Sequence, residues 1–192
     1  MARILVFDNY DSFTYNLVQY AQSIGNHKVE VFLNDEIGLD EIEAYDGIIL
    51  SPGPGLPAES GILMQLLERY KNSKRIFGVC LGQQAIAQSF GGTLRNLDAV
   101  YHGVATRIML GNPRHLIFNG LPDVIDGGRY HSWVVENETL PECLRIEAVD
   151  DNKQIMALSH KELDICSVQF HPESVLTPFG INIVSNWMKK FE

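Results

Sequence analysis

The segment from Gly78 to Gln84 constrains the fold more than any other feature of this chain. It reads Gly-Val-Cys-Leu-Gly-Gln-Gln, follows the apolar pair Ile76 and Phe77, and continues into an Ala-Ile-Ala stretch. This order predicts a buried strand, a tight turn that carries Cys80, and a helix. Glycines on both sides would let the backbone turn sharply and leave the sulfur open to a small substrate. At the first turn of a helix, unpaired N–H groups and the positive end of the dipole favour a thiolate, so Cys80 is a candidate nucleophile.

A histidine and a glutamate follow a second predicted strand, in the sequence Phe-His-Pro-Glu-Ser from 170 to 174. Two residues apart in an extended chain, they can lie on one side of the backbone, so Glu173 can orient His171 and stabilise its charged form. Pro172 restricts the backbone between them. Alone, a strand-end cysteine is more often a core residue, and a His-Pro-Glu is more often a turn with a solvated acid. Together, Cys80 and this pair predict a nucleophile with its base.

A stiff loop from Ser51 to Pro57 contains three prolines and two glycines. Pro52 and Pro54 lack N–H groups, whereas those of Gly53 and Gly55 remain unshielded. The N–H groups of Gly53 and Leu81 could together hold an oxyanion that develops beside Cys80. On its own, the loop would be equally well explained as an ordinary turn between a strand and a helix.

Short apolar segments alternate with amphipathic ones in the first half of the chain, which is typical of an α/β sheet with helices on both faces. Strands are predicted at 4–7, 29–33, 47–50 and 76–79, with helices at 13–23, 62–70 and 82–90. Later strand-like segments at 106–110, 133–135, 144–149, 155–158 and 165–169 predict antiparallel additions, and a closing helix is predicted from 178 to 190. We expect a three-layer, open, mostly parallel sheet in one domain that spans 1–192. Sites in such sheets gather beyond the carboxyl ends of the strands, where Gly53, Cys80 and His171 fall.

Together these segments resemble the signature of the class I, or triad-type, glutamine amidotransferases. The match covers 78–84, the Gln-Phe-His-Pro-Glu-Ser motif at 169–174, and Ser-Pro-Gly-Pro-Gly at 51–55 as the oxyanion loop. The segment 8–14 and the motif Arg129-Tyr130-His131-Ser132 resemble one branch, the small subunit of anthranilate synthase and its aminodeoxychorismate synthase relative. Many members carry histidine where this chain has Gln83, and we expect that change to alter the pocket wall or the partner face rather than the chemistry.

The resemblance implies a flavodoxin-like fold and a glutaminase that uses Cys80, His171 and Glu173 as a triad with a thioester intermediate. It implies an oxyanion hole at Gly53 and Leu81. The residues implied to bind L-glutamine are Gly53, Pro54, Gly55, Gln84, Ser132 and Trp133. Gln84 lies four residues beyond Cys80, which places it on the same helix face unless it is simply an exposed helix residue. No metal site and no cofactor are implied, and Arg129, His102 and His131 are read first as structural residues.

The ammonia produced by such a chain needs an acceptor that the chain does not supply. No phosphate-binding loop or dinucleotide motif is present, and no length is left for an acceptor domain. The partner that the resemblance implies is a large chorismate-binding synthase subunit: anthranilate synthase of tryptophan biosynthesis, or aminodeoxychorismate synthase of folate biosynthesis as the alternative. A free-standing γ-glutamyl hydrolase is the enzymatic rival. Asp11, Ser12, His102 and Tyr130 are expected at or near the contact with the partner.

Composition narrows the function classes further. The formal net charge of -9 disfavours nucleic acid and anionic membranes as partners. Three scattered cysteines are too few for a disulfide framework or a zinc site, which fits a reducing, cytoplasmic compartment, and no signal-peptide core is expected. A flavodoxin-like cofactor binder would need a loop rich in Gly, Ser or Thr after the first strand, but 8–13 is glycine-free and acidic. A catalytically silent module would be expected to have lost part of the triad.

Overall fold

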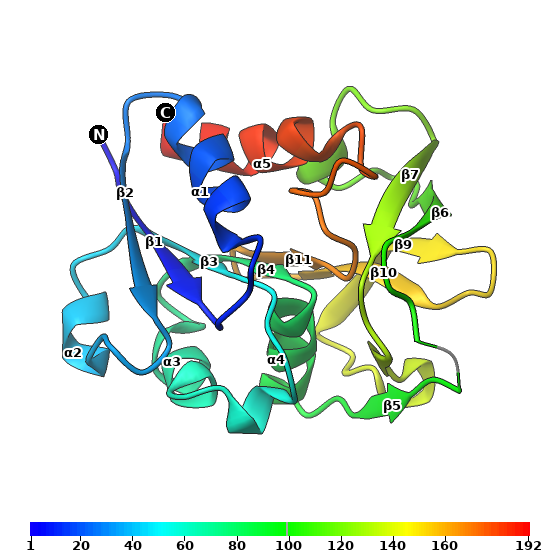
Figure 1. Cartoon of the computed structure of the whole chain (residues 1–192), viewed down its shortest axis with the longest axis horizontal. Helices are drawn as coiled ribbons and strands as arrows, with labels where there is room; N and C mark the ends of the chain where they lie inside the picture. The colour runs from blue at the N-terminus through cyan, green and yellow to red at the C-terminus, as the bar shows by residue number, and fades with distance from the viewer. Residues whose placement is uncertain (99) are drawn as a thin grey trace.

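A nine-stranded mixed sheet forms the centre of the computed structural model, which describes residues 1–98 and 100–192. Its strand order is β2-β1-β3-β4-β11-β10-β9-β6-β7, and Figure 1 shows helices above and below it. The first five positions follow the flavodoxin-like order, in which sites form beyond the carboxyl ends of the strands. The predicted three-layer α/β architecture is therefore confirmed.

The parallel half of the sheet consists of five strands, of which only the edge strand β2 has no buried residue. These are β1 (Arg3–Asp8), β2 (Lys28–Leu33), β3 (Gly47–Leu50), β4 (Arg75–Val79) and β11 (Ile165–Val168). Every residue of β3 and β11 is buried, and so is all of β1 except Arg3. Helices cover both faces of a parallel sheet, so its central strands are apolar runs rather than alternating ones, and this is why their positions were readable in the sequence.

The remaining strands of the sheet are antiparallel, as predicted for the second half of the chain. They are β6 (Val104–Leu110), β7 (Val124–Arg129), β9 (Leu144–Asp150) and β10 (Ile155–His160), while β5 (Leu94–Asn96) and β8 (Trp133–Val135) form a separate pair. The prediction was wrong for 165–169, because β11 pairs in parallel with β4 and is antiparallel only to β10. Neither β5 nor β7 was predicted. Strand β7 reads Val-Ile-Asp-Gly-Gly-Arg, whose two glycines indicate a turn, and its pairing with β6 overrides that local preference.

Two pairs of helices cover the two faces of the sheet (Figure 1). On one face, α1 (Thr14–Ser23) packs against α5 (Gly180–Met188), and their apolar side chains share a core with Phe77 and Val168. On the other, α3 (Leu63–Tyr70) packs against α4 (Leu81–Ser89), with the short, unpredicted α2 (Leu39–Ile42) beside them. Short 3₁₀ turns occur at Pro57–Glu59, Leu116–Phe118, Asn137–Thr139 and Lys189–Phe191. No helix among the described residues is long and apolar enough to cross a bilayer.

The glycines on either side of Cys80 act differently from what we expected. The residue with positive φ at the turn is Cys80 itself, not a glycine. A Cβ on Gly78 would lie 2.7 Å from the Gly82 carbonyl carbon, and one on Gly82 would lie 2.7 Å from the Leu50 carbonyl oxygen. These glycines therefore bring α4 into close contact with β3 and β4, and that contact fixes where the first turn of α4 lies.

A backbone hydrogen bond connects the antiparallel strand β7 with the segment that follows the parallel strand β11. The backbone N–H of His171, just past β11, donates to the Gly128 carbonyl of β7 over 2.8 Å. The residues that follow β7 are thereby held beside the carboxyl ends of β4 and β11. Segments far apart in sequence meet at this edge of the sheet.

Candidate active site

Cys80 lies at the turn between β4 and α4. Its backbone angles are φ 52° and ψ -99°, a conformation that a residue with a Cβ rarely adopts. The Cys80 N–H donates to the Val168 carbonyl over 2.8 Å, so β11 holds the turn in place. The residue is only 5% exposed, yet it lines a small cavity. Strain held by the surrounding sheet is typical of a nucleophile elbow.

His171 and Glu173 form a buried pair next to Cys80. The Nδ1 atom of His171 lies 2.6 Å from Oε1 of Glu173, and its Nε2 atom has no hydrogen-bond partner among the described residues. Burial lowers the pKa of His171, but interactions with Cys80 and Glu173 more than offset this and raise the pKa well above the ordinary value. The direction of this shift favours the protonated ring, with Glu173 holding it through Nδ1.

A cavity of about 210 Å³ opens beside Cys80. It is lined by Gly53, Pro54, Gly55, Cys80, Gln84, Tyr130, His131, Ser132 and Trp133. All six residues predicted to bind the substrate are in this set. Leu81 does not line the cavity, but it is the first residue of α4, where backbone N–H groups have no partner within the helix. The cavity thus brings together side chains and N–H groups from separate segments of the chain.

The Pro-Gly loop is fixed by a residue that the sequence did not single out. Asn9 donates from its backbone N–H to Ser51 Oγ over 2.8 Å and from Nδ2 to the Ser51 carbonyl over 2.9 Å. A Cβ on Gly53 would lie 2.5 Å from the Asn9 carbonyl oxygen. Only a glycine at position 53 allows the two loops to approach this closely. The available sequence signal for Asn9 was a polar residue directly after β1.

Three further residues lie at the site: Tyr130, which was expected only at the partner contact, and His131 and Gln169, which were not assigned to the site. Tyr130 and His131 line the cavity, and the Tyr130 ring lies 4.8 Å from that of His171 between centroids. Gln169 is fully buried, with Nε2 3.4 Å from Cys80 Sγ. Gln169 directly follows the buried strand β11, and a polar residue within an apolar stretch was the available signal. Arg129 is buried and paired with Asp150, in line with a structural role.

The position of the Gln83 side chain differs from what we expected. We expected it to alter the pocket wall or the partner face, but its side chain is fully buried and does not line the cavity. Its Oε1 accepts from Ser167 Oγ at 3.2 Å, and Nε2 points to the Ile155 carbonyl at 3.5 Å. Residues next to one another on a helix point in different directions, so Gln84 faces the cavity while Gln83 faces β10 and β11.

No group of histidine, cysteine or acidic residues that could hold a metal ion occurs within 1–98 and 100–192. What the site does offer is a thiol at an elbow, a His–Glu pair, and free N–H groups around a small polar cavity. Such an arrangement is typical of thiol-dependent enzymes that act on a carbonyl carbon.

The chain belongs to the class I glutamine amidotransferase family, whose model matches residues 5–191. It is 44% identical over 190 residues to aminodeoxychorismate/anthranilate synthase component 2 of Bacillus subtilis, covering 98% of this chain and 96% of that one. It is 42% identical to anthranilate synthase component 2 of Pseudomonas aeruginosa, covering 97% and 95%. A longer relative, the bifunctional protein TrpGD of Thermotoga maritima, is 43% identical, and the chain covers 32% of its length. The crystal structure of a Thermoplasma acidophilum protein described as a GMP synthase subunit superposes with a TM-score of 0.87 at 28% identity, covering 98% and 93%.

Proposed function

We propose that this chain is the glutaminase component of a chorismate-using synthase, with anthranilate synthase as the first candidate. The observation that carries the chemistry is the position of Cys80: a strained elbow residue, open to a 210 Å³ cavity, with His171 beside it. The relatives named as component 2 of such synthases match over nearly their full length, which supports the choice of pathway.

In the proposed mechanism the Cys80 thiolate attacks the γ-carbonyl carbon of L-glutamine. The N–H groups of Gly53 and Leu81 stabilise the negative oxygen that forms. His171 then protonates the leaving nitrogen, the C–N bond breaks, and ammonia departs from a γ-glutamyl thioester. A water molecule that His171 deprotonates cleaves the thioester to glutamate and restores the thiolate. Glu173 holds the ring through Nδ1 and stabilises its charged form.

The cavity lining fits an amino acid with a polar side chain. We propose that Gly53, Pro54, Gly55 and Gln84 border the amide end of glutamine, and that the backbone around Ser132 and Trp133 holds the rest. Gln84 is itself fixed, because its Nε2 donates to the Trp133 carbonyl over 2.9 Å.

The proposed partner is a large chorismate-binding subunit that docks over the mouth of the site. Of the four residues expected at this contact, Ser12 and His102 are exposed, and Asp11 and Tyr130 are half-buried. Tyr130 contacts the His171 ring, so a partner seated on it would lie within reach of the reacting groups. The three cysteines are free, which supports a reducing compartment such as the cytoplasm.

Replacing the nucleophile tests this proposal. Cys80→Ser in the assembled complex should abolish glutamine-dependent synthesis but leave synthesis from added ammonium salts, because the acceptor chemistry belongs to the other subunit. Cys143→Ser, at a half-buried cysteine outside the cavity, is the matched control and should retain both activities. Equal loss of both activities in Cys80→Ser would contradict the assignment.

Copurification decides between the alternative partners. The large subunit recovered with the chain is assayed for anthranilate formation and for aminodeoxychorismate formation. The product or products formed identify the partner synthase. Hydrolysis of γ-glutamyl peptides at a rate that no partner changes would instead indicate a free-standing γ-glutamyl hydrolase.

A further inference from the structure

A chain of buried polar groups leads from the end of β7 to the sulfur of Cys80. It begins at Arg129, which is fully buried and directs Nη1 at Asp150 Oδ2 over 2.7 Å. The guanidinium stacks 3.6 Å from the centroid of the Tyr101 ring, and its Nε–H donates to Nε2 of His131 over 3.1 Å. An arginine that is fully buried and held by these contacts calls for a reason beyond packing.

The contact with Arg129 settles the tautomer of His131. A guanidinium can only donate, so Nε2 of His131 accepts and the ring proton is on Nδ1. Nδ1 lies 3.0 Å from the Trp133 carbonyl oxygen, to which it then donates. Burial, followed by the charges of Arg129 and His171, lowers the pKa of His131 to about 3, so the ring is neutral at physiological pH.

Two side-chain amides connect the Trp133 carbonyl to the sulfur. The Trp133 carbonyl oxygen can only accept, so the group of Gln84 that faces it at 2.9 Å is the NH₂. The same nitrogen lies 3.4 Å from Oε1 of Gln169. With its oxygen used in this way, Gln169 presents its own NH₂ to Cys80 Sγ, at 3.4 Å. The Trp133 carbonyl accepts from both His131 and Gln84, and from Gln84 onward the donations run toward the sulfur.

We infer that Gln169 is a hydrogen-bond donor that stabilises the Cys80 thiolate, and that Arg129 and His131 act through it as positioning residues. This rests on the proposed role of Cys80 as the nucleophile. An amide is well suited to the task because it cannot take a proton from the thiol, and so it leaves proton transfer to His171. A hydrogen bond to a charged acceptor is strong enough to alter the fraction of thiolate by about tenfold or more.

Alkylation of Cys80 by iodoacetamide, followed as a function of pH, tests the role of Gln169. Gln169→Met keeps the length of the side chain but removes the donor, so we expect the pH midpoint of alkylation to rise by about one unit and the rate at neutral pH to fall about tenfold. Glutamine turnover should show a lower kcat with little change in KM. Gln88→Met, the same change on the outer part of α4, is the matched control and should leave the midpoint unchanged. A Gln169→Met midpoint equal to that of the wild type overturns the inference.

Two substitutions at His131 test the positioning role. His131→Asn keeps an N–H group near the position of Nδ1, whereas His131→Leu does not, and both remove the acceptor for Arg129. We expect His131→Leu to raise the midpoint and His131→Asn to restore it toward the wild-type value. If both variants fold, as judged by circular dichroism, and share one midpoint, the positioning role is wrong.

A separate measurement keeps the two proposals distinguishable. Mass spectrometry after treatment with a glutamine-analogue affinity label reports whether Cys80 of the wild type is the nucleophile. Absence of label on Cys80 defeats the proposed function, whereas labelled Cys80 with an unchanged Gln169→Met midpoint defeats only the inference.

Discussion

At the scale of single residues, Cys80 has a backbone conformation that is sterically unfavourable for a residue with a Cβ. Its φ of 52° costs about 1–3 kcal/mol, which the surrounding sheet must sustain. The sequence signalled a turn through Gly78 and Gly82, but it could not show which residue would carry the strain. That depends on contacts between β4, β11 and α4, which no local pattern records. Cys80, His171 and Glu173 could be chosen from the sequence because their spacing has a chemical meaning, whereas a role for Gln169 rests on its distance to the sulfur in the folded chain.

The raised pKa of His171 predicts a pH-dependent contribution of Glu173 to stability. Burial opposes the charged ring, but Cys80 and Glu173 favour it, so the folded-state pKa lies above the unfolded value of about 6.5. Stabilisation by the pair is therefore fully present below about pH 6.5 and is lost as the pH rises through the folded-state pKa. Glu173→Gln keeps an acceptor for Nδ1 but removes the charge.

Urea denaturation of the wild type and Glu173→Gln from about pH 5.5 to 9 measures this effect. The difference in free energy of unfolding between the two proteins should be largest at the acidic end of this range and should shrink toward the alkaline end. A difference that does not vary with pH would show that Glu173 acts only by packing.

At the scale of elements, the close packing of α4 on β3 sets the position of the nucleophile. The parallel strands were predictable because burial on both faces makes them continuously apolar, as in β3 and β11. Strand β7 was not, because its Gly127-Gly128 pair favours a turn and only the partner strand β6 makes it extended. The same pair has a tertiary role: a Cβ on Gly127 would lie 2.9 Å from Cγ of Phe170.

Gly82→Ala tests this packing. The new Cβ would lie 2.7 Å from the carbonyl oxygen and 2.8 Å from Cβ of Leu50, so α4 must move away from β3. We expect a loss of about 1–3 kcal/mol in the free energy of unfolding, together with lower glutaminase activity, because α4 carries Cys80 at its first turn. Gln88→Ala on the same helix is the control for helix propensity. Unchanged stability and activity in Gly82→Ala would show that the contact with β3 is not needed.

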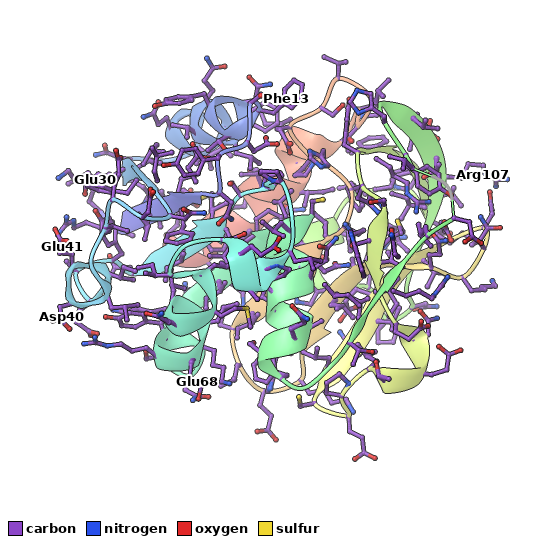
Figure 2. The ribbon with its side chains drawn as sticks, turned by 60° about the horizontal axis from the view of Figure 1, so that its bottom comes forward. Phe13, Glu30, Asp40, Glu41, Glu68 and Arg107 are labelled. Atoms are coloured by element: carbon purple, nitrogen blue, oxygen red, sulfur yellow. The ribbon has the colours of Figure 1, made fainter. Side chains whose placement is uncertain are left out.

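At the scale of the whole molecule, exposed apolar side chains gather beside the site. The net charge is -9, and Figure 2 shows Asp40, Glu41 and Glu68 on the side of α2 and α3, where Asp40 pairs with Arg69 and Glu68 with Lys71. Phe13 lies at a different edge, at the start of α1, and its ring is 5.9 Å from that of Tyr130. No pattern in the sequence predicted this apolar edge as a unit, because its members come from distant segments.

The apolar rim at the mouth of the site consists of Phe13, Tyr130 and Val175. With His171 and Glu173 they border a hollow of about 80 Å³. Val175 is 95% exposed and Phe13 is 44% exposed. An exposed apolar rim beside reacting groups is typical of a surface that a partner covers. It also suits the chemistry, since ammonia released into water at neutral pH is mostly protonated and no longer nucleophilic.

Val175→Asp should therefore weaken binding of the proposed chorismate-binding subunit without disturbing the fold. A charge at the centre of an apolar contact is expected to reduce affinity by about tenfold or more. For the wild type, glutamine hydrolysis should be slow in the isolated chain and should rise when the proposed partner binds and covers the site. Val175→Asp should keep the slow basal rate but need more partner to reach the same rise. Val124→Asp is the matched control and should respond like the wild type. Val124 starts β7, at the end of the strand away from Arg129 and the site. Full hydrolysis by the isolated chain, unchanged by any partner, would contradict the coupling.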